Sequence, residues 1–250
     1  MTRRARLAMF LAGALGLAVM LACAEIFLPG PEKMRSRYLE QINLRTAPER
    51  NITDAVTAVN FDYRGFDTVG EEFILFVSVM GSIVLLRQPE EKQERSLRDA
   101  VTEGRDVPPS PAMRLWIVAM VAPKVLFGIY VVTHGQLTPG GGFQGGVILA
   151  SCALIIYVGE NFDIFKKVMS HRWLELAEGG GAGLFVVLGM IAWLWGSPFL
   201  TNTLPLGKRS ELTSGGTIPL ISIATGLEVM AGFVLLLHAF LQETLTKSSE

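Results

Sequence analysis

The chain has 250 residues, of which half are apolar and only 18% charged, and its formal net charge is −1. Soluble domains are nearer a quarter charged, so this composition argues against a water-soluble fold, and the near-zero charge argues against a nucleic-acid partner. The mean hydropathy is +0.40, and the apolar residues form blocks of about twenty, the length that a helix needs to cross a bilayer. We therefore expect an all-α integral membrane protein.

Six apolar blocks predict six transmembrane helices, two in a front part and four in a back part. A basic start gives the first block some likeness to a signal peptide, but its length favours a retained helix. The second and fourth blocks are near the lower length limit for spanning. The expected spans are about 7–28, 69–86, 115–133, 143–159, 179–196 and 218–241.

The distribution of Lys and Arg predicts the orientation, because cytoplasmic loops are enriched in both. Thirteen of the 22 basic residues fall on the side of the two termini and eight on the other side, so we expect both termini in the cytoplasm. A polar, proline-rich stretch at 88–113 predicts a cytoplasmic linker. It divides the chain into a front segment, 1–87, and a four-helix back domain, 114–250.

A glycine run precedes the fourth span, in the sequence TPGGGFQGG at 138–146. A phosphate-binding loop would require Lys followed by Ser or Thr, which is absent here, so the run predicts the start of a helix instead. Small residues then recur at helical spacing and allow a neighbouring helix to approach closely. Close packing is favoured over ion contact. The residues of this motif are Pro139, Gly140, Gly141, Gly142, Phe143, Gly146 and Ala150.

The sequence THGQLTPGGGFQGGVILA resembles the signature of the B-type subunit of the multisubunit Mrp-type Na+/H+ antiporters, also called Mnh or Pha. The resemblance extends over about 113–243 and includes the later sequence SPFLTNT at 197–203. Gln136 departs from the pattern, since many members have a histidine there, and this puts a proton-carrying role for that position in doubt.

The front part carries a second motif, NFDYRGFDTVGE, at 60–71. Asp67 and Glu71 are expected near a helix amino terminus, where the helix dipole stabilises carboxylates, and Arg64 can pair with Asp62 or Asp67. Upstream, an apolar face behind the possible caps Thr53 and Asp54 predicts a short amphipathic helix at the outer surface. That face consists of Ile52, Ala55, Val56 and Val59.

This front motif is similar to the tail of the large, A-type subunit of the same antiporters and to a separate small subunit, of the E type, in related membrane-bound hydrogenases. The resemblance covers about 49–87, and two motifs in one chain imply that an A-tail segment is fused to a B-type subunit. The residues that carry it include Asp62, Arg64, Gly65 and Phe66.

Charged residues within the spans need a reason, because each costs about 2.5–3.5 kcal/mol at mid-bilayer on insertion scales. Lys124 lies mid-span beside Pro123, and structural pairing and use in an ion path are both open for it. Glu228 lies mid-span in the last helix and is its natural partner, although Glu228 can also line a hydrated cavity.

Other ionisable residues lie nearer the ends of spans. His134 is expected to be a hydrogen-bonding turn residue more than a proton shuttle. Glu25 and His238 are expected to extend toward the interface, and Glu178 to face water at a helix start. The candidates for an ion pathway are Lys124, Glu228, Glu71, Asp67, His134 and Glu25.

No catalytic set or metal-ligand spacing occurs in the sequence, so we expect neither an enzyme nor a cofactor or metal site. The resemblance implies a subunit of an electrogenic cation/proton antiporter in a prokaryotic inner membrane. It further implies partner subunits of types A, C, D, E, F and G, surrounding lipid, and Na+ and H+ as the transported ions. Two alternatives remain: a subunit of a redox-driven complex of the energy-converting hydrogenase type, and a purely architectural scaffold.

Overall fold

The computed structural model describes residues 37–86, 110–160, 165 and 169–247, together with residues 12, 15, 16, 18–20, 22, 23 and 26. The chain divides into two compact units, Met1–Leu44 and Arg45–Glu250. The boundary lies inside α2 (Arg37–Arg50). Helices, turns and loops make up the described residues, with no strand among them, which confirms the all-α class. Most of the expected first span and of the linker lies outside this part of the chain.

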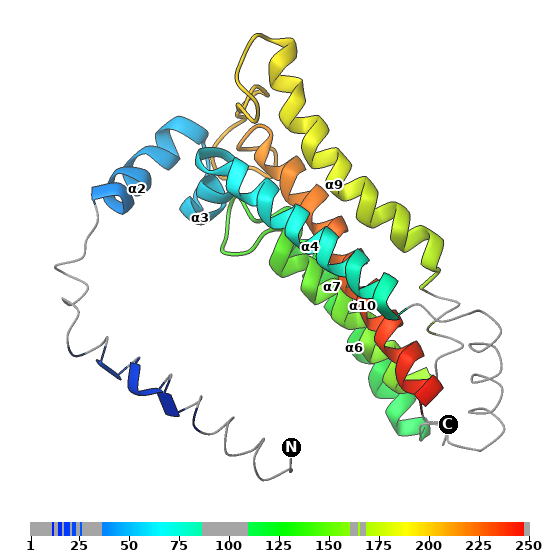
Figure 1. Ribbon diagram of the computed structural model, residues 1–250. Coiled ribbons are helices and arrows are strands. Elements are labelled where there is room, and N and C mark those ends of the chain that lie inside the picture. The colour runs from blue at the N-terminus through cyan, green and yellow to red at the C-terminus, as the bar shows by residue number, and fades with distance from the viewer. Residues whose placement is uncertain are drawn as a thin grey trace. The chain divides into compact units, whose positions relative to one another are not determined.

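Long helices that run in alternating directions make up most of the described part of the second unit (Figure 1). They are α4 (Gly65–Leu86), α6 (Pro111–Thr133), α7 (Gly142–Glu160), α9 (His171–Leu194) and α10 (Ile218–Lys247). Four of these helices are long and apolar enough to cross a bilayer, whereas the apolar stretch of α7, Gly142–Val158, is shorter. Five of the six expected spans therefore correspond to helices of the described chain.

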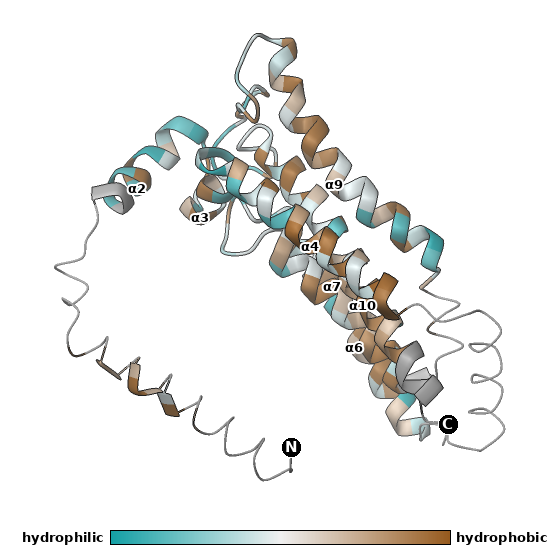
Figure 2. Ribbon diagram, viewed as in Figure 1, coloured by the Kyte–Doolittle hydropathy of each residue, from teal (hydrophilic) through white to brown (hydrophobic). Residues whose placement is uncertain are grey.

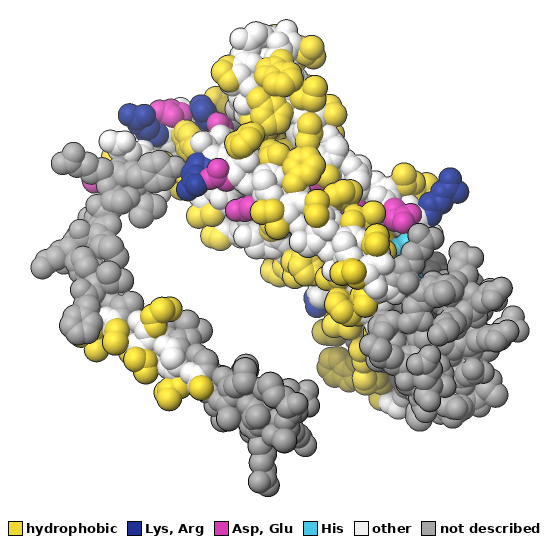
Figure 3. Space-filling model, in the orientation of Figure 1, with side chains coloured by type: hydrophobic (Ala, Val, Ile, Leu, Met, Phe, Trp, Pro, Cys, Tyr) yellow, Lys and Arg dark blue, Asp and Glu magenta, His cyan; other side chains and the backbone are white. Residues whose placement is uncertain are grey.

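Helix α10 lies at the centre of this unit and contacts α9, α7, α4 and α6. Of its most apolar stretch, 61% is buried within the chain, against 17–33% for the other three long spans. The outward faces also carry many apolar residues: brown residues follow the helices in Figure 2, and hydrophobic side chains are spread along the helices in Figure 3. Apolar surface of this extent is typical of helices that meet lipid or partner subunits.

Three helices begin earlier than the apolar blocks predicted. Helix α4 begins at Gly65, α6 at Pro111 and α9 at His171. Helix α6 starts where capping chemistry permits, because the Ser110 hydroxyl accepts a hydrogen bond from the Met113 amide and Pro111 occupies the first turn. A hydropathy pattern detects only the apolar middle of a transmembrane helix, so the more polar first turns of these helices were assigned to loops.

The short helix predicted before the front motif is present, and the residues of its apolar face differ in burial. Asp54 caps α3 (Ala55–Ala58) by accepting a hydrogen bond from the Thr57 amide at 2.7 Å. A π-helical turn, η1 (Val59–Tyr63), follows. Ile52 and Phe61 are buried in the core, while Val56 is 61% exposed. Ala55 and Val59 are partly buried, so the predicted apolar face packs on the core at Ile52 and is exposed at Val56, as in a helix that lies at a membrane surface.

Candidate functional site

Three glutamates are buried where α4 and α9 pack on α10. Glu72 in α4 and Glu178 in α9 are each 2% exposed, and Glu228 in α10 is fully buried. Carboxyl groups are seldom this buried unless they are paired, and ionisable groups within a membrane span usually have a function. This carboxyl cluster is therefore the candidate site of the chain.

Within the cluster, the carboxyl groups of Glu72 and Glu228 face each other. The Thr225 hydroxyl, almost one turn before Glu228, lies beside the Glu72 carboxyl group. Both carboxyl oxygens of Glu72, both of Glu228 and the Thr225 hydroxyl lack a hydrogen-bond partner among the described residues. Five polar atoms thus meet in one buried place, and the Thr225 hydroxyl is the one donor group among them.

Glu178 reaches the same region from the neighbouring helix because α9 and α10 approach closely. A Cβ added at Gly181 would lie 2.7 Å from the backbone nitrogen of Glu228, and one added at Gly232 would lie 3.3 Å from Oε1 of Glu178. Glycine at both positions leaves room for this crossing. As a result, the Glu178 carboxyl group acts electrostatically on Glu228.

The predicted pairing of Lys124 with Glu228 is wrong, because the Glu228 carboxyl group has no hydrogen-bond partner among the described residues and faces Glu72 instead. Lys124 lies on α6, which packs mainly on α7, and its charge acts on Cys152 of that helix. The rotation of α10 about its axis turns Glu228 toward α4 and α9. The predicted pairing relied on the mid-span positions of Lys124 and Glu228, and those positions do not show which way each side chain faces.

Two further expectations are corrected by the positions of α9 and α10. Glu178 does not face water, since α9 starts at His171 and places Glu178 two turns inside the helix, buried. His238 does not extend to the interface. It is 5% exposed and stacks on Phe165 and His171, with ring centroids 5.9 and 5.5 Å away.

The glycine run forms the loop that joins α6 to α7. Gly140 and Gly141 have φ values of +155° and +121°, which favour glycine, and the Gly141 amide donates to the Val131 carbonyl at 3.1 Å. His134 ends α6, with Nδ1 3.1 Å from the Tyr130 carbonyl oxygen and its ring stacked on Tyr130. Along α7, Gly142, Gly146 and Ala150 lie at helical spacing, and the two glycines lie against α10.

Gln136, at the position where the resemblance expects histidine, connects the front segment to the glycine loop. Its side-chain nitrogen donates to the Leu212 carbonyl at 2.8 Å, and its backbone carbonyl accepts from the Thr53 and Asp54 amides at 3.1 and 3.3 Å. The Thr57 hydroxyl donates to the Gly135 carbonyl at 2.7 Å. These bonds give Gln136 a structural role in this chain.

The front motif divides into a buried half and an exposed half. Asp62, with a side chain only 7% exposed, pairs with Arg50 and accepts a hydrogen bond from the Asn202 side chain at 3.3 Å. Arg64 pairs with Asp67 at the surface, the second of its two expected partners.

Nearby residues of the same motif separate in the same way. Gly65 lies against Leu200, where an added Cβ would be 3.4 Å from that side chain, and Phe66 is 73% exposed.

Burial and the Glu49 carboxylate raise the pKa of Tyr63. Glu71 is exposed, while Glu25 lies outside the described residues.

Sequence reasoning missed Glu72, Thr225, Arg50 and Asn202. Glu72 shares a helical face with Thr68 and Val79, and all three are at most 3% exposed. A periodicity analysis of α4 could have found this stripe and assigned Glu72, not Glu71, to the interior. Arg50 and Asn202 come from segments far apart in the sequence, so no local pattern links them.

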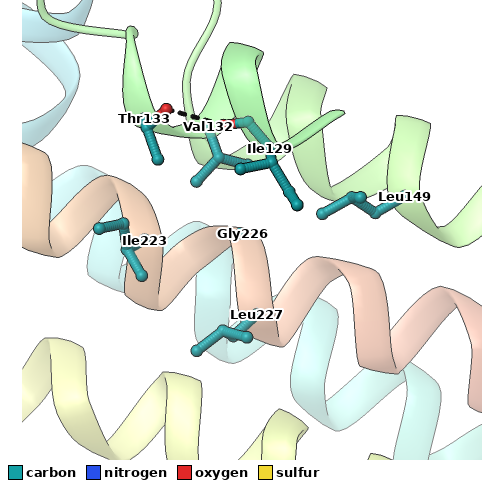
Figure 4. Close-up of a pocket in the computed structure, with 7 residues that line it drawn as sticks. All are labelled: Ile129, Val132, Thr133, Leu149, Ile223, Gly226 and Leu227. Carbon is teal, nitrogen blue, oxygen red and sulfur yellow. Dashed lines mark hydrogen bonds between the residues drawn. The ribbon is translucent and has the colours of Figure 1, made fainter. Parts of the chain in front are cut away.

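An apolar hollow of about 190 Å³ lies between α6, α7 and α10 (Figure 4). Its lining residues are Ile129, Val132, Thr133, Leu149, Ile223, Gly226 and Leu227. Because none of these side chains is charged, the hollow suits hydrocarbon rather than an ion, and the carboxyl cluster remains the candidate for ion chemistry.

Comparison with known proteins identifies a family. Residues 112–235 match the family described as "Domain related to MnhB subunit of Na+/H+ antiporter". An uncharacterized protein of Methanocaldococcus jannaschii is 30% identical over 226 residues, 80% of this chain and 83% of that protein. A Rhizobium meliloti protein, named as the probable A/B subunit of a K+/H+ antiporter, is 26% identical over 88% of this chain and 23% of its own length.

Solved structures show the same fold. A chain of the membrane-bound sulfane sulfur reductase, an archaeal respiratory membrane complex, has a TM-score of 0.71 and 25% identity, covering 96% of this chain and 99% of that one. A chain of the Mrp complex from Dietzia sp. has a TM-score of 0.69 and 19% identity over 96% of this chain and 26% of that one. The fold and the buried carboxyl groups define a multi-pass helical membrane subunit. This chain belongs to the family of MnhB-related proteins, which resemble the B-type subunit of Mrp antiporters.

Proposed function

We propose that the chain is a membrane subunit of a multisubunit electrogenic Na+/H+ antiporter. The observation that carries this proposal is the alignment of both the front and back parts with a protein named as the A/B subunit of an antiporter, with the MnhB-related match in the back part. Carboxyl groups buried within spans give such a subunit the means to handle ions.

The antiporter proposal includes partners, ions and a place. Other Mrp-type subunits, of types A, C, D, E, F and G, cover part of the apolar outer surface, and lipid covers the rest. Na+ and H+ are the ions that the complex moves across a prokaryotic cell membrane, with both termini of this chain in the cytoplasm. Candidates for its ion route are Glu228 and Lys124 within spans, and Asp67, Glu71 and His134 nearer the surface.

The proposal also includes a fusion of two segments. Residues 1–87 correspond to the tail of an A-type antiporter subunit, and 114–250 to a B-type subunit. The A/B designation of the Rhizobium protein supports this division.

A redox-driven complex is the second candidate function. Its support is the sulfane sulfur reductase chain, which matches almost end to end at 25% identity. The two candidates differ in the source of energy: an antiporter exchanges cations with protons without electron transfer, whereas a redox-driven complex requires an electron donor.

Transport in everted membrane vesicles tests the proposed function. Deleting the gene for this chain in its host should abolish Na+-dependent proton movement, measured with a pH-sensitive dye and no electron donor, and the wild-type gene should restore it. Movement only in the presence of an electron donor would favour the redox-driven complex and contradict the antiporter.

A variant at the carboxyl cluster separates ion handling from scaffolding. Glu228→Gln should assemble normally but reduce exchange about tenfold or more, while Glu211→Gln, in an exposed loop, should keep wild-type exchange. Full exchange in an assembled Glu228→Gln complex would support the architectural scaffold instead.

A further inference from the structure

We propose that Glu72 and Glu228 form a one-proton site, in which two facing carboxyl groups share a single exchangeable proton between α4 and α10. This inference rests on the proposed function, because a Na+/H+ antiporter delivers protons to its subunits. It goes further by assigning the proton to a specific pair of side chains, one of which the sequence did not single out.

Burial and the lack of donors are the first argument for a bound proton. Glu72 is 2% exposed and Glu228 fully buried, and none of their four carboxyl oxygens has a hydrogen-bond partner among the described residues. Two adjacent carboxylates out of water repel each other and lose hydration. One proton between them removes a charge and supplies the missing hydrogen bond.

The Thr225 hydroxyl is an independent second observation. This hydroxyl is fully buried and has no hydrogen-bond partner among the described residues. It lies beside the Glu72 carboxyl group. A hydroxyl can donate to a carboxylate or accept from a carboxylic acid. Thr225 can therefore bond to the pair both with and without the proton.

The surrounding charges increase the need for a proton. Glu178 from α9 acts on Glu228, and Glu71 from α4 acts on Glu72. Glu175 in turn acts on Glu178. The one lysine within a described span, Lys124, acts on Cys152 and leaves the pair without a cationic partner. The described residues also contain no group of three or more His, Cys, Asp or Glu side chains able to hold a metal ion.

Proton uptake and release at this site are balanced by a single transfer. Uptake forms one O–H bond and changes the pair from two negative charges to one, and release to a base or water breaks that bond and restores the second charge. No electron transfer or further reactant is involved. An exchanging site of this kind differs from a permanently neutral acid pair, which would keep its protons at every working pH.

Infrared difference spectroscopy of the intact complex in native membranes tests the site. A change in pH should reveal a carbonyl stretch of a protonated carboxyl group that shifts in D2O. Glu72→Gln and Glu228→Gln should each remove this band, while Glu211→Gln should retain it. Thr225→Val should keep the band but shift its frequency, because one hydrogen bond to the pair is lost.

Two outcomes would overturn the inference: the absence of a pH-dependent carboxyl band in the wild type, or an unchanged band in both glutamine variants. Co-purification of the partner subunits is measured on the same samples. If the partner subunits co-purify but the carboxyl band is absent, only the one-proton site is contradicted. If the chain purifies without partner subunits, the proposed function is contradicted.

Discussion

Glu71 and Glu72 are adjacent in the sequence but lie in different environments. Glu71 is exposed on α4, and Glu72 is buried against α10. At 3.6 residues per turn, neighbouring side chains point about 100° apart. One of two adjacent residues can therefore lie on the surface that meets lipid or a partner subunit while the other lies in the interior. The chemistry of each glutamate in this motif therefore depends on the rotation of α4.

Two aspartates of the same motif offer a matched comparison of ion pairs. Asp62→Asn removes the charge that pairs with Arg50 in a half-buried place, where the side chains of Arg50 and Asp62 are 28% and 7% exposed. The loss leaves Arg50 without its partner, and we expect it to lower the free energy of unfolding by about 1–3 kcal/mol. Thermal unfolding of the purified protein measures the change.

Asp67→Asn is the control for that variant, since the Arg64–Asp67 pair is exposed and such pairs contribute about 0–1 kcal/mol. Equal loss of stability in the two variants, or a larger loss for Asp67→Asn, would contradict the structural importance of the buried half of the motif.

At the scale of elements, a seam of small residues holds α7 against α10. A Cβ added at Gly146 would lie 2.8 Å from the Cβ of Val229 and 2.9 Å from the Gly226 carbonyl oxygen. In lipid, helices associate through this type of close packing, because the surrounding hydrocarbon provides no hydrophobic driving force. The seam also fixes the rotation of α10, and with it the direction of Glu228.

Gly146→Ala should therefore disturb α10 as well as α7. We expect it to destabilise the protein by about 1–3 kcal/mol, because the added methyl group overfills the contact. Thermal unfolding in detergent measures the effect. Gly180→Ala in α9 is the matched control, since a Cβ there has no neighbour within 4 Å and alanine favours a helix by up to about 1 kcal/mol. If the Gly180→Ala variant were as unstable as the Gly146→Ala variant, the claim that the small-residue seam holds α7 against α10 would be contradicted.

Element positions were largely predictable from the sequence, and element starts were not. Apolar blocks located α4, α6, α7, α9 and α10, since crossing a bilayer demands length and hydrophobicity. The start of α9 was placed eight residues late because Arg172, Glu175 and Glu178 read as a loop. Glu178 is buried by its contact with α10, and burial by another helix leaves no signal in the local sequence.

At the scale of the whole molecule, helix rotation decides which charges meet. Glu228 was predicted as a functional residue, because a carboxylate mid-span is conspicuous in any sequence. Its neighbours Glu72 and Glu178 were not, because the sequence does not show that α4 and α9 both pack on α10. Depth in the membrane can be estimated from sequence position, whereas the facing direction of α6 and α10 depends on how all the helices pack.

The front and back parts also meet in a shared core, where Ile52 and Phe61 cluster with Phe185, Ile218 and Ile221. Two separate polypeptides, 1–100 and 101–250, should therefore co-purify when expressed together. The same pair with Phe61→Asp should separate, because a charge would enter this core at a cost of several kcal/mol. Separation of the wild-type halves would show that the linker holds the parts together.

Identification of what accompanies this chain tests the central claim most directly. The tagged chain would be extracted gently from its native membrane, its companions identified by mass spectrometry, and the purified material reconstituted into vesicles for Na+/H+ exchange. We predict that several hydrophobic subunits co-purify and that the assembly exchanges Na+ for H+. A monodisperse single chain that transports on its own would contradict the account.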